Sequence, residues 1–206
     1  MKITLSNLIP TEKALLASSF FQNFGIEAAY FVGITGYAAY ELEAGPELIA
    51  LVMFYLTMFQ MIGSAVSGAL IDRMGPRKTL IMSMSLNIAI SLFSLFLGHN
   101  VPVFIAFVAG LGLTFSMSRT SFHSFAPYIY DQKAGLSRVN SLILGAAYTA
   151  SIIGPAAGAL VVRNFPIQTV FLVAAGVSLV ALYAAFRSEE LRCPVNENRE
   201  KHALKD

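Results

Sequence analysis

Charge is what this sequence has least of. Only 13% of its 206 residues are charged, whereas a soluble domain carries about 25%, so an ordinary water-facing surface is excluded. The net charge is only +2, and no basic stripe with interleaved aromatic residues is present, which argues against a nucleic-acid partner. There is a single cysteine, Cys193, and it excludes an internal disulfide.

Patterns typical of enzymes and metal sites are also missing. His99, His123 and His202 do not have the spacing of metal ligands. The sequence contains neither G-x-S-x-G nor H-E-x-x-H, and the glycines at 110–112 lack the strand and turn of a phosphate-binding loop. We therefore expect no enzymatic activity, no cofactor and no metal.

Hydrophobic residues make up 56% of the chain and fall in long runs. A helix that spans a membrane needs about 20 mostly apolar residues, and six segments qualify. They are expected at residues 14–40, 46–71, 79–97, 101–125, 139–162 and 167–186. The predicted fold is an all-α membrane protein with six transmembrane helices in a lipid bilayer. Residues 1–187 form its helical domain, and residues 188–206 form a polar cytoplasmic tail.

The basic residues predict the orientation in the membrane. With the N-terminus in the cytoplasm, twelve of the fourteen lysines and arginines fall on the inner side: Lys2, Lys13, Arg73, Arg77, Lys78, Lys133, Arg138, Arg187, Arg192, Arg199, Lys201 and Lys205. Glu41, Glu43 and Glu47 fall on the outer side. Because cytoplasmic loops are enriched in lysine and arginine, both termini are expected in the cytoplasm.

Two stretches ninety residues apart resemble each other. "GALIDRMGPRKT" at 68–79 and "GALVVRNFPIQT" at 158–169 are identical at six of twelve positions. The first copy keeps its charges, whereas the second has lost most of them, as expected if the two face opposite sides of the membrane. Small apolar residues recur by chance in membrane helices, which is the alternative explanation. The repeat predicts a 3+3 inverted arrangement, which is typical of secondary transporters.

A compact charged turn joins the second and third predicted helices. In "DRMGPRK", Gly75 and Pro76 are typical turn residues, and the charges alone could be a stop signal for membrane insertion. The spacing resembles the signature of the major facilitator superfamily, through Gly68, Asp72, Arg73, Gly75, Arg77 and Lys78. The resemblance implies half of a twelve-helix fold. It also implies that Asp72, Arg73 and Arg77 form a charge relay that closes the cytoplasmic side.

The fifth predicted helix carries a row of small residues and a proline. Pro155 removes a backbone hydrogen bond, and small residues every four positions let another helix approach closely. Ordinary membrane packing explains this spacing equally well. The pattern resembles the antiporter motif of exporters in the same superfamily, which implies a hinge at Gly145, Gly154, Pro155 and Gly158. Ala157 departs from that motif, which often has a second glycine there.

The segment that joins the fourth and fifth helices is similar to family 3 of this superfamily, the drug and macrolide exporters. Arg119 at the inner end of helix four, Asp131 in the loop, and Arg138 and Asn140 before helix five carry this resemblance. It is looser than that of the charged turn.

Glu27 lies near the middle of the first predicted helix. A charged side chain at the centre of a bilayer costs at least about 2.5–3.5 kcal/mol, so it takes up a proton, faces a wet cavity or pairs with a cation. Asn23 and Tyr30 are its helical neighbours on the same face. We expect Glu27 to carry a coupling proton or contact the substrate; the alternative is a purely structural acid. Asn87 in the third helix is expected to hydrogen-bond between helices.

The resemblance implies the N-terminal half of a proton-coupled exporter of small amphipathic molecules, working by alternating access in a bacterial inner membrane. Such a half needs a second six-helix half as a partner, supplied by the same gene product, by a separate chain or by a homodimer. The alternative is a non-transporting fragment or an assembly partner of another membrane protein.

Overall fold

The computed structural model describes residues 10–125 and 133–187, and within them every regular element is helical. In chain order the elements are α1 (Pro10–Ala28), η2 (Ala29–Ile34), η3 (Tyr37–Glu41), α2 (Pro46–Met74), α3 (Pro76–Phe93), η4 (Ser94–Phe96), α4 (Val101–His123), α6 (Lys133–Asn164) and α7 (Gln168–Arg187). The predicted tail at 188–206 and the loop residue Asp131 lie outside the described residues.

Five helices are long and apolar enough to cross a membrane: Pro46–Met74, Pro76–Phe96, Val101–His123, Ser137–Asn164 and Gln168–Arg187. They confirm an all-helical membrane protein and five of the six predicted spans. The first predicted span is helical from Pro10 to Glu41, but its backbone passes from α-helix into the π-helical η2 and η3. Its α-helical part also carries five polar side chains inside the span, namely Ser18, Ser19, Gln22, Asn23 and Glu27. The sixth span therefore stays a prediction.

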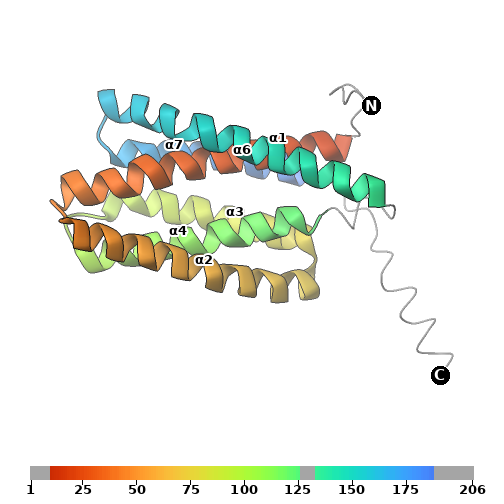
Figure 1. The fold of residues 1–206 in the computed structure, drawn as a ribbon, viewed down its shortest axis with the longest axis horizontal. Helices are drawn as coiled ribbons and strands as arrows, with labels where there is room; N and C mark the ends of the chain where they lie inside the picture. Colours follow the sequence, from red (N-terminus) through yellow and green to blue (C-terminus); the bar gives the residue numbers. More distant parts are fainter. Residues whose placement is uncertain (1–9, 126–132, 188–206) are drawn as a thin grey trace.

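The helices run lengthwise in two groups, with α1, α6 and α7 on one side and α2, α3 and α4 on the other (Figure 1). Within the groups, α2 packs mainly against α4, and α6 packs mainly against α1. The groups are joined chiefly where α3 meets α7, whereas α1 and α4 touch each other little. This arrangement leaves space between α1, α4 and α6.

The connection between α2 and α3 is a single glycine. Gly75 has φ 85° and ψ 161°, a conformation that is essentially restricted to glycine. Its amide donates to the Ile71 carbonyl at 2.8 Å, which closes the last turn of α2. Pro76 then begins α3, where a missing N–H costs nothing because first-turn amides have no helical acceptor. The predicted glycine–proline turn is confirmed.

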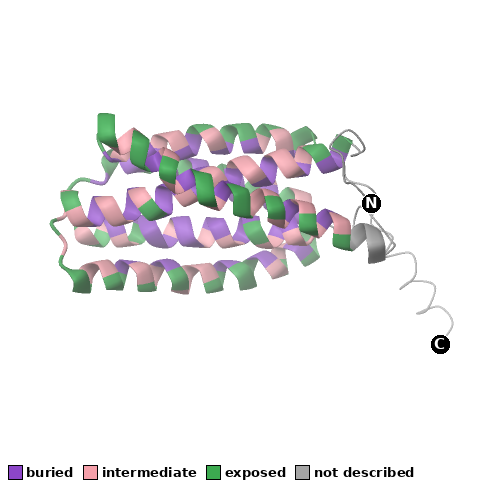
Figure 2. Ribbon diagram, turned by 45° about the horizontal axis from the view of Figure 1, so that its top comes forward, coloured by how far each residue is buried: buried purple, intermediate pink, exposed green. Residues whose placement is uncertain are grey.

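Burial separates an inner from an outer surface (Figure 2). Of the most apolar window in each helix, 56% is buried in α4 but only 17% in α2 and in α6. Large apolar side chains on the two outer helices are exposed, including Met61 at 72% and Ile152 at 78%. Exposed apolar surface of this extent requires a lipid or protein environment. The chain is an integral membrane protein.

Buried aromatic and amide side chains connect the helices. Tyr37 stacks on Phe104 at 4.9 Å between ring centroids, and Phe107 meets Phe171 edge to face at 5.0 Å. Asn87 of α3 donates its amide to the Thr114 hydroxyl of α4 at 3.0 Å. The Ser178 hydroxyl of α7 donates to the Asn87 carbonyl oxygen at 3.4 Å. The prediction that Asn87 bonds between helices is confirmed.

Candidate functional site

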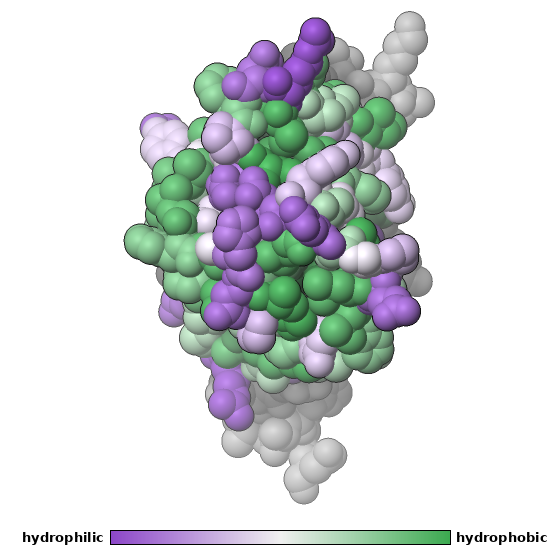
Figure 3. All heavy atoms as spheres, turned by 90° about the vertical axis from the view of Figure 1, so that its left-hand side faces the viewer, coloured by the Kyte–Doolittle hydropathy of each residue, from purple (hydrophilic) through white to green (hydrophobic). Residues whose placement is uncertain are grey.

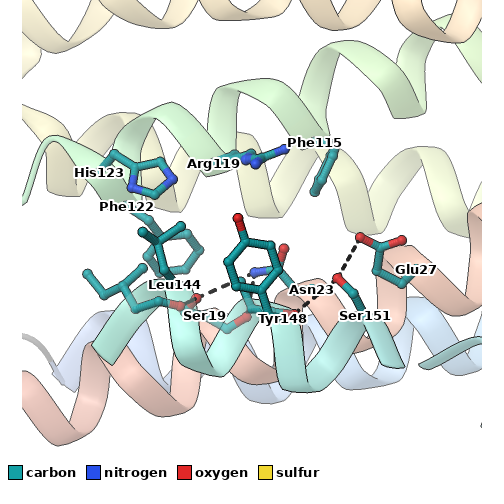
Figure 4. A pocket seen from close by; sticks show the side chains of 12 residues that line it. Ser19, Asn23, Glu27, Phe115, Arg119, Phe122, His123, Leu144, Tyr148 and Ser151 are labelled. Atoms are coloured by element: carbon teal, nitrogen blue, oxygen red, sulfur yellow. Dashed lines mark hydrogen bonds between the residues drawn. The ribbon is translucent and has the colours of Figure 1, made fainter. Parts of the chain in front are cut away.

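A cavity of about 130 Å³ lies between α1, α4 and α6, and Glu27 lines it (Figure 4). α1 contributes Glu27, Asn23 and Ser19. The lining residues from α4 are Phe115, Arg119, Phe122 and His123, and those from α6 are Ile143, Leu144, Ala147, Tyr148 and Ser151. The cavity therefore brings together one carboxylate, one guanidinium, one imidazole and several hydroxyl and amide groups inside a largely apolar bundle.

Glu27 is tied to α6 through a serine. The Ser151 hydroxyl lies 2.9 Å from the Glu27 Oε1 and donates to it. The same hydroxyl lies 3.1 Å from the Ala147 carbonyl oxygen in its own helix. Figure 4 shows the two side chains meeting at one end of the cavity. Glu27 thus faces a polar cavity and accepts a hydrogen bond from Ser151. Both features stabilise a carboxyl group in the middle of a membrane span.

Asn23 lies one helical turn before Glu27 and also faces the cavity. Its amide donates to the Ser19 carbonyl at 2.7 Å and lies 3.4 Å from the Ser19 hydroxyl. That hydroxyl donates to the Ile143 carbonyl of α6 at 3.3 Å. Asn23 therefore belongs to the polar side of α1, as predicted.

Arg119 of α4 lines the cavity and lies between Phe115 and His123 (Figure 4). Among the described residues it forms no ion pair. The hydroxyl end of the Tyr148 side chain points from α6 toward Arg119 in the same view. The Arg119 guanidinium and the Tyr148 hydroxyl therefore supply hydrogen-bond donors on a part of the cavity wall away from Glu27.

Tyr30 is placed differently from Glu27 and Asn23. It does not line the cavity; its hydroxyl donates to the Leu111 carbonyl of α4 at 2.9 Å. Its ring packs edge to face on Phe115 at 5.3 Å, and Phe115 lines the cavity. The prediction that Tyr30 shares a face with the acid holds only in that both turn toward α4. The structure makes Tyr30 a core residue behind the cavity wall.

The small residues of α6 pack against α1. A Cβ atom on Gly154 would lie 2.8 Å from the Phe24 carbonyl oxygen, and one on Gly158 would lie 3.2 Å from the Ala28 carbonyl oxygen. Gly145 faces open space, and α6 continues as a helix through Pro155. Two of the three predicted hinge glycines thus hold α6 close to the segment that carries Glu27.

The charged turn lies at the end of the bundle where α1 begins (Figure 1). Asp72, Arg73 and Lys78 are exposed, and no described residue forms an ion pair with them. Arg77 instead donates to the Phe186 carbonyl at 2.9 Å, so its cation caps the last turn of α7. A Cβ atom on Gly68 would meet nothing within 4 Å. Among the described residues, no ion pair joins Asp72 to Arg73 or Arg77, so the charge relay stays a prediction.

Arg138 and Asn140 lie near the beginning of α6 and are partly buried. Arg138 approaches Glu12 of α1, with 3.7 Å between Nη2 and Oε2. The Asn140 Oδ1 is buried and has no hydrogen-bond partner among the described residues. Arg138 is thus engaged with α1, and neither residue lines the cavity.

The sequence did not indicate Ser151, Tyr148 or His123 as site residues. Ser151 and Tyr148 lie in "AAYTASII", where a hydroxyl every few residues is ordinary for a membrane helix. Only the close approach of α6 to α1 identifies Ser151 as the partner of the acid. Among the residues that the structure describes, no three histidine, cysteine or acidic side chains are grouped to hold a metal ion.

Known proteins agree with this architecture. Residues 15–205 match the Major Facilitator Superfamily. Multidrug resistance protein MdtG of Citrobacter koseri is 28% identical over 172 residues, which cover 83% of this chain and 40% of that protein. MdtG of Salmonella arizonae is 26% identical over 155 residues, which cover 75% of this chain and 36% of that protein. This chain thus spans 40% or less of the length of these relatives. It belongs to the Major Facilitator Superfamily, whose members are membrane transporters and not enzymes.

Proposed function

We propose that this chain is the N-terminal six-helix half of a proton-coupled exporter of small amphipathic molecules, with Glu27 as the proton carrier. The observation that carries the proposal is the position of Glu27 in a cavity between three helices, bonded to Ser151 and facing Arg119. A carboxyl group that reaches a cavity within the membrane can take up a proton from one side and release it to the other. Cargo and proton would then occupy the cavity alternately.

The size of the cavity supports a second half. Sites for drug-sized molecules usually measure about 300–1,000 Å³, whereas this cavity measures about 130 Å³. α6 lines it, and both α6 and α2 have largely exposed apolar surfaces. A second six-helix half facing these helices would complete the walls, from the same gene product, a separate chain or a second copy.

The charges at the two ends support an orientation with cytoplasmic termini. The end where α1 begins carries a basic excess among the described residues: Lys13, Arg73, Arg77, Lys78, Arg138 and Arg187, against Glu12 and Asp72. The opposite end holds the connections between η3 and α2 and between α6 and α7, and hydrophilic side chains gather across it (Figure 3). Its charged residues are Glu41, Glu43, Glu47 and Arg163. This asymmetry is typical of a basic end in the cytoplasm, here that of a bacterial inner membrane.

The exposed turn supports a cytoplasmic gate. Gly68 and Asp72 lie one helical turn apart on α2, and nothing among the described residues covers them. Asp72 stands at the C-terminal end of α2, where the helix dipole disfavours an anion. A helix N-terminus of the second half, seated against Gly68, would stabilise Asp72 and close this end. Arg73 and Lys78 would complete the gate, with Arg77 holding α7.

The packing supports the inverted repeat. α2 packs on α4 as α6 packs on α1, and α3 meets α7 between them. The Gly75 amide bonds to Ile71, and the Phe165 amide, ninety residues later, bonds to Val161 at 3.0 Å. Such matched contacts are expected when two three-helix units are related by an axis in the membrane plane.

The test of this proposal is cargo-driven proton movement in membrane vesicles that contain the native gene product. Glu27→Gln keeps the shape and a hydrogen-bond acceptor but cannot release a proton, so we expect coupled export to fall to background while membrane insertion is unchanged. Glu47→Gln, an exposed acid at the start of α2, is the matched control and keeps full activity. Normal export by Glu27→Gln would end the coupling role. Silence of the native protein with every amphipathic cargo tried would favour a non-transporting fragment or assembly partner.

A further inference from the structure

We infer that Ser151 is a positioning residue that links the proton on Glu27 to the proline of α6. The inference rests on the proposed role of Glu27 as a proton carrier. The Ser151 hydroxyl lies within hydrogen-bond distance of two acceptors, the Glu27 carboxylate at 2.9 Å and the Ala147 carbonyl at 3.1 Å. A hydroxyl has a single proton to donate, so the two bonds compete.

Pro155 makes the backbone at Ser151 unusual. In a regular α-helix the carbonyl of Ser151 would accept the amide of the residue four positions later. That residue is Pro155, which has no N–H. The turn from Ser151 to Pro155 therefore lacks one helical hydrogen bond. The preceding turn, from Ala147 to Ser151, contains the carbonyl to which the Ser151 hydroxyl can bond.

The contact between α1 and α6 fixes the acid at this level. A Cβ atom on Gly154 would lie 3.2 Å from the Glu27 Cβ and 3.3 Å from the Ala28 amide nitrogen. The missing side chain at Gly154 thus leaves room for the stem of Glu27 close to α6, while Ser151, three residues earlier, bonds to the tip of the side chain. With its stem held, the Glu27 carboxyl stays within reach of the Ser151 hydroxyl in both protonation states.

Proton uptake reverses the direction of this hydrogen bond. An ionised Glu27 only accepts, so the Ser151 hydroxyl donates to it. When a hydronium ion that reaches the cavity gives a proton to the carboxylate, an O–H bond of the hydronium breaks, a neutral water remains, and the new O–H on Glu27 can donate to the Ser151 oxygen. The Ser151 proton is then free to turn to the Ala147 carbonyl. No other covalent bond changes.

The turn of the hydroxyl acts on the helix. The Ala147 carbonyl already accepts the Ser151 amide in a regular α-helix, and a second donor from a serine side chain weakens that bond and favours bending. The bend would fall next to the bond that Pro155 removes. The state of Glu27 is thereby transmitted to the shape of α6 through one side chain.

Other charged and titratable groups share the cavity with Glu27. Arg119 and His123 line the cavity from α4, Tyr148 lines it from α6, and α7 contributes no lining residue. These groups bias how readily Glu27 takes up its proton. Among the described residues, only Ser151 hydrogen-bonds to the carboxylate, so the reversal of the bond concerns this residue.

Infrared difference spectroscopy of the full chain in lipid bilayers, between acidic and neutral buffer, tests the inference. The band of a protonated carboxyl shifts in frequency with its hydrogen bonds, and Glu27→Gln identifies the Glu27 component by removing it. We expect Ser151→Ala to shift this component and Ser151→Thr, which keeps a hydroxyl, to restore it. Thr149→Ala is the matched control, because Thr149 bonds to the Gly145 carbonyl at 2.8 Å in the same helix and bonds to no acid among the residues that the structure describes.

Each outcome decides something different. A shift with Ser151→Ala, its recovery with Ser151→Thr and no change with Thr149→Ala would support the link. A Glu27 component that is the same in Ser151→Ala would overturn it and leave the proton role of Glu27 intact. Absence of any Glu27 component in the native chain would overturn both, since the acid would then not take up a proton.

Discussion

In the helix pairs α2–α4 and α6–α1, a glycine lets the two backbones approach closely, but the groups beside the two contacts differ. In the first pair, a Cβ atom on Gly63 would lie 2.4 Å from the Leu113 carbonyl oxygen. In the second, a Cβ atom on Gly154 would lie 2.8 Å from the Phe24 carbonyl oxygen. The tighter pair is joined by hydroxyl groups such as that of Ser67, which donates to the Met117 carbonyl at 3.1 Å. The looser pair holds the ionisable Glu27. Both pairs are therefore closely packed, but the α6–α1 pair also holds an ionisable carboxyl group beside its contact.

The largest loss of stability is expected when a side chain is added at Gly63, where α2 and α4 approach most closely. Gly63→Ala places a methyl group against a backbone oxygen that cannot rotate away, so α2 and α4 must separate. Overpacking of this kind costs about 3 kcal/mol at the upper end of its usual range. Thermal unfolding in lipid nanodiscs measures the loss. Gly68→Ala in the same helix, where the methyl meets nothing within 4 Å, should leave the midpoint unchanged; equal losses in the two variants would refute the close-contact explanation.

The two matching turns differ in a way that predicts the next effect. Gly75 takes φ 85° and joins α2 directly to α3, whereas Phe165 at the corresponding place is followed by two more residues before α7. Gly75→Ala forces an alanine into a conformation that costs about 2 kcal/mol, and we expect a lower unfolding midpoint. Phe165→Ala removes an exposed ring and should change the midpoint little. A neutral Gly75→Ala would show that the turn relaxes to a longer form.

The smallest of the three effects on stability belongs to the looser pair. Gly154→Ala also meets a backbone oxygen, but at 2.8 Å this contact is less severe than the one at Gly63, so we expect a smaller loss of about 1 kcal/mol. The variant sharpens the comparison, because it should also displace Glu27 from Ser151 and lower coupled transport more than stability. Gly145→Ala in the same helix, which faces open space, is the control for both measurements. A transport loss no greater than the stability loss would contradict this role.

Local chemistry was sufficient to predict much of the fold. Long apolar runs gave the spans α2, α3, α4, α6 and α7, and the dipeptide at Gly75 and Pro76 gave the turn. Glu27 was predicted because a carboxyl group within an apolar run is costly wherever the helix packs. Such inferences need only the chain within one or two helical turns.

What could not be predicted depends on which helices become neighbours. Nothing in the sequence pairs Ser151 with Glu27, since the two residues are far apart in the chain and meet only because Gly154 lets α6 approach α1. Tyr30 was placed with the acid by helical spacing, yet its hydroxyl found a carbonyl of α4 at the point where the backbone widens into η2. The partner of the charged turn could not be predicted, because none of the described residues packs on its exposed side.

The length of α6 has a mechanical consequence. Its 32 residues, Lys133 to Asn164, make a rod of about 48 Å at 1.5 Å per residue. The hydrocarbon core of a bilayer is about 30 Å thick, so at the usual tilt of about 20° α6 extends about 15 Å beyond it. The part of α6 on one side of Pro155 can act as a lever up to the bend at that residue. Whatever grips the projecting turns can move residues in the middle of the membrane without entering it.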